Sequence, residues 1–263
     1  MPADPSGAAT VLLVHGAYHG AWCWDPVRAR LTELGVPSLA PELPLTGYAA
    51  DVAAVRAAAE RAGRGPLVVV AHSYSGIVVA DAAHRADRLV FVAARMPLPG
   101  ESQTELSPRW HVPGLGDSTA VDEAGWARVG PAAREVFYAD CPPGLADEAM
   151  SRLRPMRSAV PARPLDEPAW LTAPTAYVVC RRDRVVRVDR QRERAALVDE
   201  HHELDCGHSP FLAVPGDLAR LLAEQARKAA SAPAPHHHAD RTRRTPPWRT
   251  NRKCSSSEQD RPG

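Results

Sequence analysis

This chain of 263 residues lacks paired cysteines, long apolar runs and the segments of a signal peptide, and each absence excludes a class of protein. The five cysteines are scattered and form no C-x-x-C pair, so we expect no metal site and a reduced, cytoplasmic setting. No apolar run approaches the length of a membrane span. The first residues also lack the charged and apolar segments of a signal peptide. We therefore expect no membrane partner.

An excess of charge of one sign is also missing from most of the chain. The formal net charge is +1, but residues 232–263 carry seven Arg or Lys and three Asp or Glu, which leaves −3 for residues 1–231. A body without a basic excess does not favour nucleic acid as a partner. The C-terminal segment, residues 231–263, mixes proline, histidine and arginine without an apolar period, so we expect a disordered tail.

The stretch Leu67–Ala80, LVVVAHSYSGIVVA, combines a strand-like run, an abrupt turn and a helix-like run. The β-branched run is typical of a fully buried strand, and the small apolar residues after Ser73 suit a packed helix. A serine at such a turn is typical of a nucleophile elbow, whose pattern is G-x-S-x-G. Ala71 and Ser75 replace its two glycines, which weakens the match. A buried structural serine is the alternative interpretation.

Strands and helices alternate along the chain, which predicts an α/β fold with a doubly wound, mostly parallel sheet. The runs that we interpret as strands are Thr10–His15, Val36–Ala40, Leu67–Val70, Arg88–Ala94, Thr175–Cys180 and His201–Leu204. Besides the helix after Ser73, the stretches that we interpret as helices are Trp22–Leu34, Tyr48–Ala62 and Asp217–Ala230.

A long proline-rich interruption, residues 96–168, separates two of the predicted strands. We expect short helices in it around residues 123–129, 132–139 and 145–153. An insertion of this length among short loops predicts a helical lid, with a plain surface excursion as the alternative. The predicted organisation is thus an α/β core over residues 9–95 and 169–230, a lid over residues 96–168, and the tail.

A serine nucleophile needs a base, and the base needs an orienting acid. His208 directly follows the last predicted strand, and Asp183 follows the strand before it by three residues, whereas Asp189 and Asp205 are less well placed. Ligand sites of open α/β sheets gather at the carboxyl ends of the strands, where both residues fall. The chain order Ser73, Asp183, His208 is nucleophile, acid, base, which is the order in one large superfamily of hydrolases.

Attack on a carbonyl creates an oxyanion, which two backbone N–H groups usually stabilise. One belongs to the residue after the nucleophile and the other to the loop after the first strand. In this chain those residues are Tyr74 and Ala17. Gly16, Tyr18 and His19 share the loop with Ala17, and we expect them to contact substrate; for Gly16 a simple tight turn is the alternative.

Four motifs together resemble the α/β-hydrolase superfamily: HGAYHGAWCWDPV, AHSYSG, CRRDRVV and CGHSPFL. They are most similar to the branch of plant-type methylesterases, hydroxynitrile lyases and related bacterial esterases, as are FVAARMPLPGES and FYADCPPGLADEAMSRLRP. The resemblance covers about residues 9–228. It implies Ser73 as nucleophile, Asp183 as acid, His208 as base, and Ala17 and Tyr74 as oxyanion donors. It also implies a helical lid and no cofactor.

These observations predict a cofactor-free serine hydrolase that cleaves a small carboxylic ester through an acyl-enzyme. One alternative is a lyase or cyclase that uses the same triad as a base, and another is a catalytically silent protein that binds a small ligand. In the lyases of this resemblance a lid lysine holds the cyanide leaving group, but lysine occurs here only as Lys228 and Lys253, outside the lid. The natural substrate and the oligomeric state remain open.

Overall fold

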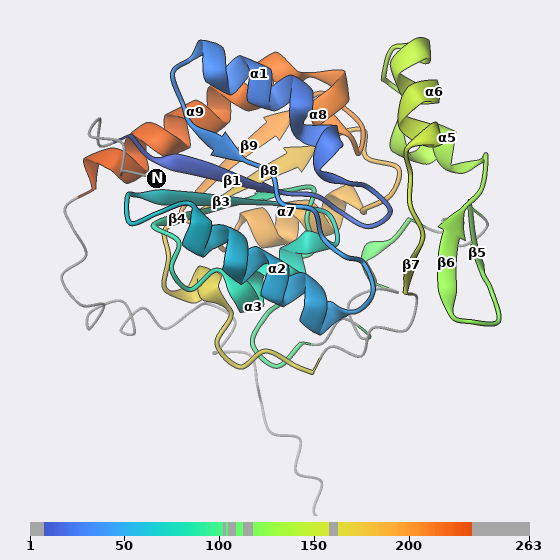
Figure 1. The fold of residues 1–263 in the computed structure, drawn as a ribbon, viewed down its shortest axis with the longest axis horizontal. Coiled ribbons are helices and arrows are strands. Elements are labelled where there is room, and N and C mark those ends of the chain that lie inside the picture. Colours follow the sequence, from blue (N-terminus) through green and yellow to red (C-terminus); the bar gives the residue numbers. More distant parts are fainter. Residues whose placement is uncertain (1–7, 102–103, 105–108, 113–117, 158–162, 233–263) are drawn as a thin grey trace, which may run out of the picture.

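A sheet of six parallel strands forms the centre of the molecule (Figure 1). The computed structural model describes residues 8–101, 104, 109–112, 118–157 and 163–232, so the predicted tail lies outside it from residue 233 onward. In sheet order the strands are β2 (Ser38–Leu39), β1 (Thr10–Val14), β3 (Leu67–His72), β4 (Arg88–Val92), β8 (Thr175–Cys180) and β9 (Glu200–Leu204). All neighbours pair in parallel, which confirms the predicted sheet.

Helices cover both faces of this sheet (Figure 1). On one face lie α1 (Asp25–Glu33), α8 (Pro210–Ala213) and α9 (Pro215–Ser231). On the other lie α2 (Tyr48–Arg61), α3 (Ser75–Ala82) and α7 (Val188–Ala195). All six residues of β3 and all six of β8 are buried, which explains why both read as continuous apolar runs. Two short 3₁₀ helices, Ala21–Trp24 and Ala169–Leu171, complete the core.

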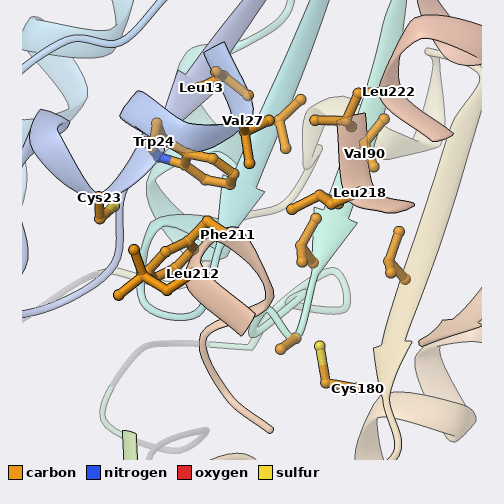
Figure 2. Close-up of a cluster of buried hydrophobic side chains, with 14 of the residues drawn as sticks. Leu13, Cys23, Trp24, Val27, Val90, Cys180, Phe211, Leu212, Leu218 and Leu222 are labelled. Atoms are coloured by element: carbon orange, nitrogen blue, oxygen red, sulfur yellow. The ribbon is translucent and has the colours of Figure 1, made fainter. Parts of the chain in front are cut away.

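The face under α1, α8 and α9 is sealed by a cluster of buried side chains (Figure 2). Trp24 and Phe211 are two large members of this cluster, and their ring centroids are 5.3 Å apart. Because Phe211 belongs to α8, this packing anchors the short helix that directly follows the loop of His208. Replacing such a ring by alanine typically costs about 3–5 kcal/mol.

The insertion between β4 and β8 contains a small antiparallel sheet as well as helices. Its elements are β5 (Thr119–Val121), β6 (Trp126–Val129), α5 (Ala133–Phe137), α6 (Pro143–Ser151) and β7 (Met156–Arg157). The predicted helices around 132–139 and 145–153 therefore correspond to α5 and α6. Figure 1 shows the insertion beyond the carboxyl ends of the strands, on the side to which β8 and β9 point.

The helix predicted around 123–129 is wrong, because this segment forms a β-hairpin with residues 119–121. Val121 pairs with Ala127, and Gly125, with φ of 81°, sits in the turn between them. A left-handed backbone at Gly125 stops a helix and reverses the chain. No helix in the described part of the chain combines the length and apolar character needed to cross a membrane.

Candidate active site

Ser73 sits in the sharp turn between β3 and α3 with φ of 53°. A residue other than glycine in this left-handed region stores backbone strain of about 1–3 kcal/mol, and such positions cluster at functional sites. A Cβ on Gly16 would lie 3.0 Å from the Cβ of Ser73, so the loop after β1 passes directly against the serine. A Cβ on Gly76 would lie 2.4 Å from the carbonyl oxygen of Arg95, so a larger residue there would force the backbone to shift.

The structure explains how Ser75 replaces a glycine of the elbow pattern. Its buried hydroxyl accepts the backbone N–H of His72 at 2.9 Å. It also lies 2.9 Å from the carbonyl oxygens of Val14 and His72, and can donate its single proton to one of them. The hydroxyl thus ties β1, β3 and the start of α3 together. The tight turn is retained although the glycine is absent.

His208 and Asp183, which are 25 residues apart in sequence, are hydrogen-bonded in the interior. The Nδ1 atom of His208 lies 2.9 Å from Oδ2 and 3.1 Å from Oδ1 of Asp183. A carboxylate accepts, so Nδ1 carries the proton and Nε2 is left as an acceptor. Asp183 Oδ1 also accepts the N–H groups of Val185 at 2.7 Å and Val186 at 3.0 Å. These bonds fix the direction in which the carboxylate points.

A buried amide, which the sequence did not reveal, completes the surroundings of Asp183. Gln191 of α7 donates from Nε2 to Asp183 Oδ2 at 2.8 Å and accepts the N–H of Cys180 at 2.9 Å. No sequence pattern marks this glutamine, because it lies among the arginines and glutamates of α7. The two weaker acid candidates face outward instead: Asp189 pairs with Arg187, and Asp205 pairs with Arg181 and Arg182.

His72, the residue before Ser73, contacts the residue predicted as base. Its Nε2 donates to the backbone carbonyl of His208 at 2.8 Å, and the two ring centroids are 4.7 Å apart. Burial, and to a smaller extent the nearby His208, holds the pKa of His72 well below its usual value. The His72 ring is therefore neutral and can accept a hydrogen bond at Nδ1. Ser73, His208 and Asp183 therefore share the carboxyl edge of the sheet.

The loop after β1 is held by His15, which is fully buried. Its Nδ1 donates to the carbonyl of Gly16 at 2.9 Å, and its Nε2 accepts the N–H of Leu43 at 3.0 Å. Burial lowers the pKa of His15 to about 3, so the ring is neutral. Glu42 lies 3.8 Å from Nε2 but forms no ion pair with this unprotonated nitrogen. His15 thus orients the peptide group that carries the N–H of Ala17.

Two backbone N–H groups beside Ser73 have no acceptor in the described part of the chain, those of Ala17 and Tyr74. The side chain of Tyr74 is buried and donates to Asp51 at 2.8 Å, so it is engaged away from its own N–H. The pKa of the Tyr74 hydroxyl is raised, mainly by burial and to a smaller extent by the neighbouring Asp51. A buried N–H without an acceptor is uncommon and is suited to bind an anion.

Among the described residues, no group of three or more His, Cys, Asp or Glu side chains is arranged to hold a metal ion. The arrangement that the structure does offer is a strained serine, a hydrogen-bonded histidine and carboxylate, and two N–H donors on neighbouring loops. Such a set of groups is suited to nucleophilic attack on a carbonyl.

A model of the alpha/beta hydrolase family matches residues 11–221 of this chain. The chain belongs to the alpha/beta hydrolase family. Alpha/beta hydrolase nvfD of Aspergillus novofumigatus is 28% identical over an alignment 249 positions long, gaps included, which spans 83% of this chain and 97% of that protein. Methylesterase 3 of Arabidopsis thaliana is 26% identical over an alignment 267 positions long, gaps included, which spans 84% of this chain and 97% of that protein.

Solved structures agree with this assignment. The crystal structure of polyneuridine aldehyde esterase matches with a TM-score of 0.72 at 20% identity, over 83% of this chain and 99% of that chain. Likeness at this identity shows the fold. This alpha/beta hydrolase therefore has esterase-type relatives at low identity, and its resemblance to the methylesterase branch is confirmed.

Proposed function

We propose that this alpha/beta hydrolase cleaves a small carboxylic ester through an acyl-enzyme on Ser73. The observation that carries the proposal is the hydrogen bond from His208 Nδ1 to Asp183, at 2.9 Å, which leaves Nε2 as a proton acceptor at the edge of the sheet where the strained serine lies. A serine hydroxyl becomes a competent nucleophile when such a base takes its proton.

In the first half-reaction Ser73 Oγ attacks the carbonyl carbon while its proton moves to Nε2 of His208. Asp183 stabilises the resulting imidazolium and keeps the ring in the right orientation. The negative charge moves to the carbonyl oxygen, where the N–H groups of Ala17 and Tyr74 bind it. The tetrahedral intermediate then breaks its ester C–O bond, and His208 returns the proton to the leaving alcohol.

In the second half-reaction a water molecule gives a proton to His208 and attacks the acyl carbon. The same two N–H groups bind the second oxyanion, and Ser73 leaves with the proton that His208 returns. The loop of Gly16, Tyr18 and His19 lies beside the substrate in this proposal, with the ring nitrogens of His19 engaged by Ala17 and Tyr138.

The insertion acts as the lid in this proposal. Phe137 of α5 stacks on His208 with ring centroids 5.9 Å apart and lies 5.7 Å from His19. An apolar ring over the base excludes water from the charged groups that form during the reaction.

A fluorophosphonate probe and short p-nitrophenyl esters test this function. We expect wild-type protein to hydrolyse the esters and to be labelled at Ser73. Ser73→Ala should lose the label and about 10⁴-fold or more in kcat. Ser151→Ala, at an exposed serine of α6, is the matched control and should keep both.

Three results would point elsewhere. Ester turnover by Ser73→Ala above about a tenth of the wild-type rate would remove the nucleophile assignment. Cyanide release from mandelonitrile that depends on Ser73, without ester turnover, would favour a lyase. Absence of both label and turnover in the wild-type protein would favour a protein that only binds a small ligand.

A further inference from the structure

Three polar side chains of the insertion reach the loops that carry the proposed reacting groups. They are Tyr138 and Asp140, which lie between α5 and α6, and Arg154, which lies between α6 and β7. Each makes hydrogen bonds to residues more than sixty positions away in sequence. Such contacts can set geometry as well as cover the site.

Tyr138 is linked through His19 to the loop after β1 that carries Ala17, which we call the oxyanion loop. The Nδ1 atom of His19 lies 2.8 Å from the carbonyl oxygen of Ala17, which can only accept, so Nδ1 carries the proton. Burial lowers the pKa of His19 to about 4, so the ring is neutral and its Nε2 is an acceptor. The hydroxyl of Tyr138, 2.8 Å from Nε2, therefore donates to it. One chain of hydrogen bonds runs from Tyr138 to the peptide that follows the N–H of Ala17.

Arg154 holds the backbone of the same loop from the other side. Its Nε and Nη2 donate to the carbonyl of His19 at 3.2 and 2.9 Å, and Nη2 also donates to the carbonyl of Leu43 at 3.0 Å. Its own backbone N–H donates to the carbonyl of Tyr18 at 2.7 Å. Glu42 pairs with the guanidinium. Tyr18 has φ of 63°, and these bonds hold it in that strained conformation.

Asp140 holds the loop of the proposed base. Its Oδ2 accepts the backbone N–H of Gly207 at 2.6 Å, one residue before His208. This bond fixes the start of the loop, while His72 fixes the carbonyl of His208 at 2.8 Å. The direction of the His208 ring is thus determined from the insertion as well as from the sheet.

We propose that Tyr138, Asp140 and Arg154 are positioning residues of the reaction. Tyr138 and Arg154 aim the N–H of Ala17 at the oxyanion, and Asp140 aims His208 at Ser73. The inference rests on the proposed ester hydrolysis. The insertion then completes the catalytic geometry instead of only closing the pocket.

The test for the oxyanion loop compares esters with their thionoester analogues, because sulfur accepts a backbone N–H poorly and gains less from the oxyanion donors. Tyr138→Phe removes one hydroxyl and keeps the ring. We expect it to lower kcat for esters by about 10-fold or more, at nearly unchanged KM, and to lower thionoester turnover much less, since full loss of an oxyanion donor costs about 10²–10³ in kcat. Arg154→Ala should do the same, with weak rescue by Arg154→Lys, which lacks the planar fork.

The test for the base loop uses rescue by a conservative variant. Asp140→Asn keeps an oxygen that can accept the N–H of Gly207 and should retain most of the ester kcat. Asp140→Ala removes the acceptor and should lower kcat for esters and thionoesters equally, since it acts on the base and not on the oxyanion. Arg134→Ala is the matched control: this arginine of the insertion pairs with Asp147 at 2.7 Å on the surface and should have no effect.

Rates are expressed per Ser73 that the fluorophosphonate probe titrates, so a misfolded fraction does not contribute. An unchanged ester-to-thionoester ratio in both Tyr138→Phe and Arg154→Ala would overturn the oxyanion part, and equal kcat in Asp140→Ala and Asp140→Asn would overturn the base part. Failure of the proposed function itself would show in the wild-type protein, which would not be labelled.

Discussion

The six-stranded sheet and the insertion that follows β4 are stabilised differently. The central strands are apolar and buried, and helices cover both faces. In the insertion, α5 and α6 add buried side chains such as Phe137 and Ala146 to this core, but β5 is largely solvent-exposed, with Val121 59% exposed. Exposed ion pairs such as Arg134 with Asp147 lie on the surface of the insertion. Surface pairs of this kind contribute about 0–1 kcal/mol each, whereas a buried aliphatic side chain contributes several times more.

This difference separates the positions of the proposed reacting groups from the structure that surrounds them. Ser73 and Asp183 follow β3 and β8, whose positions are fixed by apolar packing. His208 follows the polar edge strand β9 and precedes α8, which Phe211 anchors in the core. In the described residues, a few hydrogen bonds connect the insertion to the loops of Ala17 and His208, such as those of Tyr138 and Asp140. A change at the carboxyl edge of the sheet should therefore abolish the reaction. A change at the seam, which is the set of contacts that Tyr138, Asp140 and Arg154 make with the loops of Ala17 and His208, should lower its rate. A change in the outer insertion, the part that makes none of these contacts, should leave the rate unaltered.

The largest effect should come from Asp183→Asn at the sheet edge. Asparagine keeps an oxygen for the N–H groups of Val185 and Val186, so the fold should persist. Its amide can face Nδ1 of His208 with an N–H and favour the wrong tautomer, and we expect kcat to fall by about 10⁴. The exposed Asp189→Asn is the control and should retain full ester turnover. Comparable losses in both variants would contradict the assignment.

The next effect concerns stability of the elbow. Gly76→Ala places a Cβ 2.4 Å from the carbonyl oxygen of Arg95 and 3.0 Å from the Cβ of Ala94. The backbone must shift, and overpacking of this kind costs about 1–3 kcal/mol. Urea unfolding should show a lower midpoint with an unchanged slope. A midpoint equal to that of the wild-type protein would mean that the sheet edge is less rigid than its packing implies.

The same contrast explains which elements the sequence could predict. Strands β1, β3, β4 and β8 are buried on both faces, so the chain itself carries an apolar signal at each one. The carboxyl ends of parallel strands meet at one edge, which is why Asp183, after β8, and His208, after β9, could be proposed as partners of Ser73 from the sequence. The resemblance to alpha/beta hydrolases rests on the same segments.

The insertion carries no such signal. The segment VDEAGWARV contains glutamate, alanine and arginine, which favour helices, yet it forms a hairpin because β6 pairs with both β5 and β7. Helix α7 was not predicted either, since its arginines and glutamates hide the buried Gln191. The links made by Tyr138, Asp140 and Arg154 span 67 to 135 residues, and local patterns do not encode partners at that separation.

The pH dependence of stability tests the contact between the insertion and the loop after β1 at His19, which bonds to Tyr138. Its pKa is lowered to about 4 by burial, against about 6.5 in the unfolded chain. Between these values the unfolded chain binds more protons than the folded protein. The contribution of the neutral His19 ring to the free energy of unfolding is therefore fully present above pH ~6.5 and is lost as the pH drops towards about 4. At pH 5 this residue alone accounts for a loss of about 2 kcal/mol relative to pH 8.

His19→Gln removes that titration. The variant should be less stable than the wild type at pH 8, where the bonds to Ala17 and Tyr138 are intact. Its further loss between pH 8 and pH 5 should be smaller than that of the wild type by about 2 kcal/mol, as measured by urea unfolding at both pH values. His84→Gln, at an exposed histidine, should leave the difference unchanged. An identical acid loss in wild type and His19→Gln would place the acid sensitivity elsewhere.

The smallest effect has the opposite sign and lies in the outer insertion. Gly144 occupies the first turn of α6, and a Cβ there would meet no other atom within 4 Å. Gly144→Ala restricts the unfolded chain without a clash, so it should stabilise the protein by up to about 0.4–1 kcal/mol. The same change at Gly76 destabilises, because there the neighbouring backbone is already in contact. Ester kcat should be unchanged in Gly144→Ala, since this residue lies in α6 and makes none of the links to the loops of Ala17 and His208. A fall in kcat without a loss of stability would show that the whole insertion, and not only its three polar contacts, sets the geometry of the site.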